Sequence, residues 1–400
     1  MNRVGDDSSG HLRRTYADRV RQLPEGGLIS LLRDARSRGS VDLATGTPAA
    51  PQPADEVIEA ACTALRNGVN QYEDPSGNAA LRAGIADSLR PAANPDTEIT
   101  VTVGATEAML TALLSTVDPG DEVIVAEPFY DNFLGAIALT GARPRFVRLH
   151  APDWRFDPAE LAAAFGPRTK AMILNTPHNP TGRVFDRAEL DQLAELCTRW
   201  NVTLISDEVY SAYTFDGRQH LSVAEVPGLA DRSIVVGSLS KSHALSGWRI
   251  GFLRAAPACT SVLRQVHIST TGGTAAPLQR AVLESGILAP GAWQPAPQLQ
   301  RMRDTVVETF TGIGLACGRP EGGCYLMADI RPVTSGDCES YVKLLLDHAG
   351  VLIAPGTLLY DDRPAGEHFV RIAFNKADEI IEDAARRIEG SRKALSAATG

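Results

Sequence analysis

Lysine is scarce in this 400-residue chain, since only five of its 39 basic residues are lysines. Chemistry that needs a primary amine therefore has few candidates. Four of the five, Lys170, Lys343, Lys376 and Lys393, occupy positions where solvated lysines are common: before or after a strand, on a helix face, or in the tail. Lys241 remains as the lysine to explain.

Other features are missing as well. The six cysteines are scattered, with no C-x-x-C pair and no histidine at zinc spacing, so we expect no metal site and a reducing cytoplasm. No apolar run approaches the ~18 residues that span a bilayer, and the polar first residues lack the apolar region of a secretory signal. The net charge is −9, without a Lys/Arg run. These absences predict a cytoplasmic protein with no membrane or nucleic-acid partner.

The length and the pattern of apolar runs indicate two domains. Short β-branched runs first alternate with helical stretches, as in a mostly parallel α/β sheet flanked by helices. After about residue 290 the order changes to an α+β pattern. We expect an N-terminal arm (1–45) that joins the small domain, a large domain (46–290) and a small C-terminal domain (291–400). The strands expected in the large domain are Ile99–Val103, Glu122–Ala126, Ala171–Leu174, Val202–Ser206, Ser233–Val236 and Ile250–Leu253.

Lys241 directly follows one of these buried strands, where an amine is costly unless it has a partner or loses its charge. Desolvation lowers the pKa of a lysine and makes it a nucleophile toward carbonyl groups. Ser238, Ser240 and Arg249 lie nearby in the sequence, and their hydroxyls and guanidinium suit a phosphate. Ligands of open α/β sheets bind beyond the carboxyl ends of the strands, so we expect chemistry here. A plain surface lysine is the alternative.

The pattern S-x-S-K at 238–241, with G-W-R-I-G at 247–251, resembles the cofactor-lysine segment of class I/II aminotransferases. These enzymes have the aspartate aminotransferase fold, also called fold type I. The resemblance implies that pyridoxal 5′-phosphate (PLP) is the cofactor and that Lys241 holds it. It also implies that Ser238, Ser240 and Arg249 bind the phosphate, and that the protein is a homodimer with active sites at the subunit interface.

Further motifs of this family follow in the expected order. Gly104-Ala105-Thr106 opens a helix after a strand and resembles the family's phosphate-binding turn. Amides at a helix N-terminus bind anions, so such a turn can hold a phosphate. Many such turns begin with glycine without binding anything. By the same resemblance, Tyr130 stacks on the cofactor ring. Asn179, in the tetrapeptide Asn-Pro-Thr-Gly, bonds the phenolic oxygen and borders the substrate.

Two charged residues in apolar strands extend the resemblance. Asp207 ends a strand and needs a cation, which the family supplies as the pyridinium nitrogen, and Tyr210 gives the phenolic oxygen a second hydrogen bond. Glu208 competes with Asp207, but its side chain points to the other sheet face if the strand is extended. Arg371 matches the clamp for the substrate α-carboxylate. A structural ion pair is the alternative reading of Arg371.

Two matches are less specific, and two positions depart from the family. Gly46 resembles the entrance-loop glycine that lines the substrate site, and Tyr72 resembles the tyrosine that reaches the phosphate of the neighbouring subunit. Ala49 and Ala50 replace the usual acidic residue of the entrance loop. His243 stands where an aromatic is common, and is either an extra acid/base or a packing histidine.

The resemblance implies a ping-pong transamination between an L-amino acid and a 2-oxo acid, with Lys241, Asp207 and Tyr210 as the catalytic residues. A carbon–sulfur β-lyase, an oxidase or a cyclase uses the same cofactor residues and stays open. A PLP-binding regulator requires an appended DNA-binding domain, and the enzyme fold accounts for all of this chain. No arginine for a side-chain carboxylate can be mapped, so an aspartate-specific enzyme is not supported.

Overall fold

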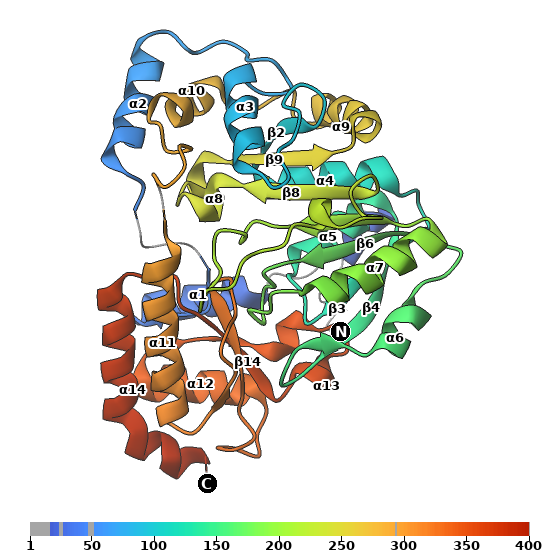
Figure 1. The fold of residues 1–400 in the computed structure, drawn as a ribbon. Helices are drawn as coiled ribbons and strands as arrows, with labels where there is room; N and C mark the ends of the chain where they lie inside the picture. Colours follow the sequence, from blue (N-terminus) through green and yellow to red (C-terminus); the bar gives the residue numbers. More distant parts are fainter. Residues whose placement is uncertain (1–16, 24–26, 47–51, 293, 400) are drawn as a thin grey trace, which may run out of the picture.

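The computed structural model describes residues 17–23, 27–46, 52–292 and 294–399, and its fold is mixed α/β (Figure 1). A large, mostly parallel sheet flanked by helices forms one part, and a smaller antiparallel sheet with its own helices forms the other. Ala49 and Ala50 lie outside the described residues.

The large sheet has eight strands. In spatial order they are β2 (Ile99–Val103), β9 (Ile250–Ala255), β8 (Ser233–Ser238), β7 (Thr203–Asp207), β6 (Thr169–Asn175), β3 (Glu122–Glu127), β4 (Arg143–His150) and β5 (Arg155–Phe156). The five strands from β8 to β4 run parallel, whereas β9 lies antiparallel between β2 and β8. Every strand expected from the sequence is present.

Alternating side chains of β3 show how both faces of this sheet are buried. Val123 and Val125 pack into one apolar cluster, whereas Ile124 and Ala126 pack into another on the opposite face, as the period of two in a strand requires. The first face is covered by α4 (Gly104–Thr116), α5 (Asn132–Thr140) and α9 (Pro257–Thr270). The second face is covered by α6 (Pro158–Ala164) and α7 (Arg187–Trp200). Crossover helices on both faces account for the near-continuous apolar runs in the sequence.

Three helices close the β2 edge of the sheet around a separate cluster, at the top of Figure 1. They are α2 (Asp55–Arg66), α3 (Ala79–Ser88) and α10 (Ala276–Glu284). The segment between α2 and α3 carries Tyr72.

The smaller sheet has the order β10 (Ala316–Cys317), β11 (Tyr325–Asp329), β14 (Phe369–Ala373) and β13 (Ala354–Pro355). The helices α11 (Ala296–Gly312), α12 (Cys338–Ala349) and α14 (Asp378–Thr399) accompany it. N-terminal elements join the same core: α1 (Gly27–Ser37) contributes Ala35, and β1 (Val41–Asp42) pairs in parallel with β12 (Val351–Leu352). The elements α1 and β1 therefore pack with the C-terminal part, whereas η2 (Asp18–Gln22) contacts α5 of the large part.

Two absences can be reported for the described part of the chain. None of its helices is long and apolar enough to cross a bilayer. Within the same residues, no three His, Cys, Asp or Glu side chains come together as a possible metal site.

Candidate active site

The residues that follow the strands of the large sheet meet around one cavity of about 250 Å³. Its lining comes from the ends of β6, β7 and β8, from the first turns of α4 and α5, and from β11 of the smaller sheet. The predicted site residues among the lining are Ala105, Thr106, Tyr130, Asn179, Asp207, Tyr210, Ser238, Ser240, Lys241 and Arg249. The topological rule for open α/β sheets thus locates the cavity correctly.

Lys241 lies on α8 (Leu239–Ser242), which starts where β8 ends. Its Nζ donates a hydrogen bond of 2.5 Å to the carbonyl oxygen of Gly46. Burial lowers the pKa of the Lys241 amine, and the positive charges of Arg249 and Arg371 lower it further. Lys241 is therefore a desolvated amine in the cavity, and the alternative of a surface lysine is wrong. A neutral amine of this kind can attack a carbonyl or accept a proton.

Hydroxyls, a guanidinium and a helix N-terminus gather on one side of Lys241. Arg249 Nη1 lies 3.4 Å from Ser240 Oγ, which lies 2.8 Å from Ser238 Oγ. A Cβ atom at Gly104 would lie 2.3 Å from Arg249 Nη2, so only glycine lets the guanidinium approach the start of α4 this closely. Arg249 forms no ion pair within the described residues. The donors present here fit a phosphate, since nothing in this group neutralises the positive charge.

Asp207 and Glu208 are adjacent, buried carboxylates with opposite surroundings. Glu208 accepts hydrogen bonds from Ser222 Oγ at 3.1 Å and from the amide of Val223 at 3.1 Å, and it pairs with His220 Nε2 at 2.9 Å. Burial opposes ionisation of Glu208, but His220 and these hydrogen bonds outweigh it, so its pKa is lowered. Glu208 thus points away from the cavity and is held by residues 220–223, as the alternation of side chains along the strand predicted.

Asp207 faces the cavity instead. Its carboxylate accepts a 3.2 Å hydrogen bond from the amide of Val209 and has no cationic partner among the described residues. Burial raises the pKa of Asp207 to about 7, and the negative charge of Glu208 adds to the shift. A cation placed against it, such as a protonated ring nitrogen, would restore ionisation. The orphaned carboxylate is the feature of this cavity that best fits a PLP ring.

Three further predicted residues border the same space. Tyr130 accepts a 2.7 Å hydrogen bond from Asn132 Nδ2, and burial raises its pKa to about 12. Tyr210 is buried beside Tyr325. This burial raises the pKa of the Tyr210 phenol well above the ordinary value, so the phenol stays a hydrogen-bond donor. The amide of Asn179 donates to Asn175 Oδ1 at 2.6 Å.

Arg371 reaches the cavity region from β14 of the smaller sheet. Its Nη2 donates to the carbonyl of Ala44 at 2.9 Å, its Nη1 lies 3.3 Å from Asn179 Oδ1, and its guanidinium carbon lies 4.4 Å from the centre of the Tyr325 ring. Only 5% of Arg371 is exposed, yet its Nε has no partner and no described carboxylate pairs with it. A buried guanidinium without an anion is suited to bind one, because it reads carboxylates with two parallel hydrogen bonds.

The two less specific matches have different surroundings. Gly46 is buried at the mouth of the site, and a Cβ atom there would lie 1.8 Å from Tyr325 Oη, so no larger residue fits without movement. Tyr72 does not line the cavity. Its side chain is 99% exposed, so none of the described residues covers it.

Sequence reasoning missed some residues and misread one. Asn175 and Tyr325 line the cavity although neither was singled out, and Asn175 carried a signal, since it ends β6 as Asp207 ends β7. The placement of Lys376 in solvent is wrong: it is 4% exposed and lies 3.3 Å from Thr45 Oγ1, where burial lowers its pKa. His243 does not line the cavity; it contacts Ser242 Oγ at 2.8 Å, and burial lowers its pKa to about 4.

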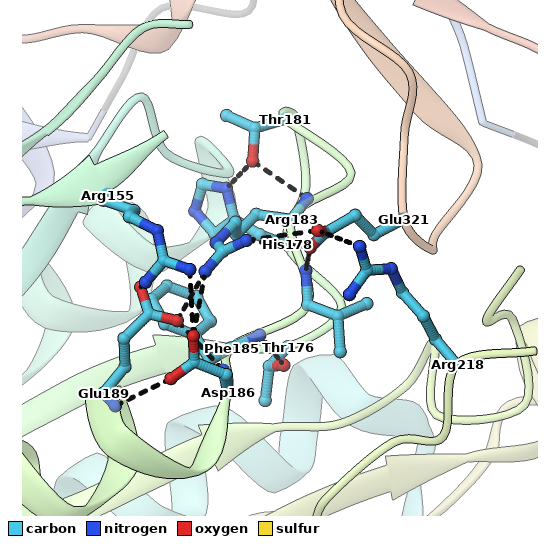
Figure 2. Close-up of polar contacts among 11 residues, drawn as sticks. Arg155, Thr176, His178, Thr181, Arg183, Phe185, Asp186, Glu189, Arg218 and Glu321 are labelled. Carbon is cyan, nitrogen blue, oxygen red and sulfur yellow. Dashed lines mark hydrogen bonds and ion pairs between the residues drawn. The ribbon is translucent and has the colours of Figure 1, made fainter. Parts of the chain in front are cut away.

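A network of ion pairs holds the Asn179 turn against the smaller sheet (Figure 2). Arg183 lies between two carboxylates, with Nη2 2.6 Å from Glu189 and Nη1 3.0 Å from Glu321. The amides of Glu321 and Gly322 both donate to the carbonyl of Gly182, which joins the turn to the segment before β11. Because Glu321 leads into β11, the network fixes Asn179 relative to Tyr325 and Arg371.

The chain is similar to known proteins over nearly its whole length. The family model described as aminotransferase class I and II matches residues 38–388. A probable N-succinyldiaminopimelate aminotransferase of Mycobacterium tuberculosis is 36% identical over 370 residues, which cover 88% of this chain and 92% of that protein. An arginine–pyruvate transaminase of Pseudomonas aeruginosa is 37% identical over 358 residues, covering 86% and 88%.

Solved structures agree with the sequence comparison. The structure of N-succinyldiaminopimelate aminotransferase from Mycobacterium tuberculosis superposes with a TM-score of 0.89 at 34% identity. The match covers 94% of this chain and 99% of that one.

Proposed function

The chain belongs to the class I and II aminotransferase family, and from that premise we propose how its cavity carries out the reaction. The protein is an aminotransferase, which moves an amino group between an L-amino acid and a 2-oxo acid in two half-reactions. The relatives compared carry aminotransferase names, so the β-lyase alternative is not favoured. The proposal concerns the cofactor, the residues, the assembly and the location.

The observation that carries the proposal is a set of buried or partly buried charged side chains that have no ion-pair partner among the described residues. Lys241, Asp207 and Arg249 face one cavity, and each complements a different part of PLP: the aldehyde, the ring nitrogen and the phosphate. Ser238, Ser240 and the amides of the Gly104–Thr106 turn complete the phosphate site. When bound, PLP supplies an electron sink for the bond that breaks at the substrate Cα.

The chain's own residues have separate tasks. With PLP bound, Asp207 would keep the ring nitrogen protonated, Tyr130 would contact the ring, and Asn179 and Tyr210 would hydrogen-bond its phenolic oxygen. Arg371 binds the substrate α-carboxylate with Gly46 beside it, which orients the Cα–H bond and can contribute several kcal/mol through positioning. Lys241 Nζ, with its lowered pKa, removes the Cα proton as general base. A donor that leaves as a 2-oxo acid would leave its amino group on the cofactor, and the acceptor would take up this group in the second half-reaction.

We propose a homodimer in which Tyr72 acts in the site of the partner subunit. Tyrosine side chains are usually at least partly buried, so the nearly complete exposure of Tyr72 in its own chain supports the assignment. Sedimentation of the active enzyme should give the mass of a dimer, and the Tyr72→Phe variant should release PLP more readily. A monomer that retains full activity would contradict the proposal.

The donor amino acid and the cellular location are finer points. The relatives are named for donors as different as arginine and N-succinyldiaminopimelate, so a panel of donors with pyruvate and 2-oxoglutarate is the direct experiment. A cytoplasmic location is supported by six cysteines that are all free thiols.

Reduction with borohydride tests the cofactor assignment. The purified enzyme should be yellow, and reduction should fix PLP covalently to Lys241. Lys241→Ala should abolish this adduct and reduce activity by several orders of magnitude, whereas Lys170→Ala, which removes an exposed lysine, should keep both. Peptide mass analysis identifies the modified residue, and an adduct on any other lysine defeats the assignment.

A further inference from the structure

His267 is completely buried on α9, although no step of the proposed reaction uses it. Its Nδ1 lies 3.0 Å from Glu107 Oε1, and its Nε2 lies 2.9 Å from the carbonyl oxygen of Pro75. A carbonyl oxygen only accepts, so Nε2 carries a proton and donates it. The ring is therefore clamped between two separate segments of the chain.

Both segments lead to the proposed phosphate site. Glu107 stands one residue after Thr106, and its other oxygen accepts a 3.2 Å hydrogen bond from the amide of Val103, which precedes Gly104. The Glu107 carboxylate thus connects the residue after the Gly104–Thr106 turn to Val103, the residue before it. Thr111 Oγ1 donates to the same carboxylate at 2.6 Å, which leaves it no freedom to turn away.

The Pro75 end leads to Tyr72, three residues earlier. The segment that follows is anchored elsewhere: the carbonyl of Ser76 accepts from the amide of Val101 at 2.9 Å, and the amide of Asn78 donates to Gln279 Oε1 at 2.8 Å. Nearer to Tyr72, Glu73 Oε2 accepts from Asn78 Nδ2 at 2.9 Å and the carbonyl of Asp74 accepts from the amide of Gly77, but both partners belong to the same segment. Pro75 ties this segment to α9. Its carbonyl has the His267 ring as the side-chain partner that fixes it.

We infer that His267 is a positioning residue for the cofactor phosphate. Through Pro75 it sets Tyr72, which serves the partner subunit, and through Glu107 it sets the phosphate-binding turn of its own subunit. One buried ring thereby fixes the contribution of a chain to both active sites of the dimer. The inference rests on the proposed role of Tyr72.

Affinity for PLP, measured by spectral titration of the stripped enzyme, tests this in a double-mutant cycle. His267→Leu and Tyr72→Phe should each raise the Kd for PLP by about 10-fold, the effect of losing one hydrogen bond to a charged or polar partner. The double variant should be no weaker than the weaker single variant, because Tyr72→Phe removes a contact that His267→Leu has already disrupted. Ser269→Ala, on the exposed side of α9, is the matched control and should leave the Kd unchanged.

Two conservative variants separate positioning from packing. His267→Gln places an amide nitrogen near the site of Nε2 and should restore most of the affinity by donating to Pro75. His267→Asn reaches only the Nδ1 site and should not. If both restore it equally, or if the Leu and Phe effects multiply, His267 does not act through Tyr72 and the inference fails. An unchanged Kd in Tyr72→Phe would instead refute the role of Tyr72, and the inference with it.

Discussion

Two regions of the molecule bury charged side chains, and they do so in opposite ways. At the junction in Figure 2, Arg183 pairs with Glu189 and Glu321 within 3.0 Å, and Arg155 and Arg218 supply further positive charge to these two carboxylates. Around the cavity, Asp207 and Arg371 are buried and Lys241 is partly buried, yet the described residues offer them no opposite charge. Burial without a partner costs free energy, which a protein recovers only when a ligand supplies the partner.

The difference separates residues that build the fold from residues that await a substrate or cofactor. Arg249 and Arg371 leave the cavity region positively charged, which suits anions such as a phosphate and a carboxylate. The junction is neutral and close to the cavity, so its task is to hold the Asn179 turn in place. Substitutions in the cavity should therefore act mainly on activity, and substitutions at the junction mainly on stability.

The largest effect is expected at Asp207. Asp207→Asn keeps the shape but removes the charge that stabilises a protonated ring nitrogen, and kcat should fall by roughly 100- to 1000-fold, as for loss of a preorganised electrostatic partner. Glu208→Gln is the matched control, because Glu208 is satisfied inside the chain, and its kcat should stay within a few-fold of wild type. Steady-state kinetics with excess PLP makes the comparison. Equal losses in both variants would contradict the division into two regions.

The same substitution should have the opposite effect on stability in enzyme stripped of PLP. Burial raises the pKa of Asp207 to about 7, so the folded chain keeps a proton that the unfolded chain has lost above about pH 4. Stability is therefore lost as the pH rises from about 4 to about 7. At pH 8, Asp207→Asn should raise the free energy of unfolding by ~2–4 kcal/mol. Urea denaturation at pH 5 and pH 8 measures this, and the gain should shrink at the lower pH.

Arg371 should give the next largest effect. Arg371→Leu removes the guanidinium while filling its space, and kcat/KM for an amino acid should fall by about 100-fold, the usual result of truncating one partner of a buried charge pair. Arg331→Leu, an exposed arginine on the same part of the molecule, should change kcat/KM little. An amine without a carboxylate should react equally well with wild type and Arg371→Leu. If it loses the same factor, Arg371 does not bind the carboxylate.

Most of the site could be predicted because it depends on positions along the chain. Lys241, Asp207 and Asn179 follow apolar strands, and parallel strands end on one side of their sheet. The strand β4 (Arg143–His150) could not be predicted, because it lies near the sheet edge and three of its first residues are exposed. A continuous apolar run marks only those strands that are buried on both faces, and β4 is not one of them.

Contacts between residues far apart in the sequence could not be predicted, for a different reason. His267 and Glu107 are 160 positions apart, and no local pattern indicates that α9 and α4 pack side by side. Lys376 was misread because a lysine after a strand is usually solvated, whereas here Thr45 and Asp42 receive it. In both cases, the tertiary neighbour decides whether a charge is buried.

The smallest of the expected effects belongs to the junction and concerns stability. Arg183→Met keeps the bulk of the side chain but leaves Glu189 and Glu321 with only their exposed partners Arg155 and Arg218, so the free energy of unfolding should fall by ~2–3 kcal/mol. Lys343→Met, which breaks an exposed pair with Asp347, should cost less than ~0.5 kcal/mol. Adding Glu321→Gln to Arg183→Met should cost less than the two single changes together, because the second removes a charge that the first left unpaired. If the costs simply add, the buried charges at the junction do not stabilise one another, and the contrast with the cavity loses its physical basis.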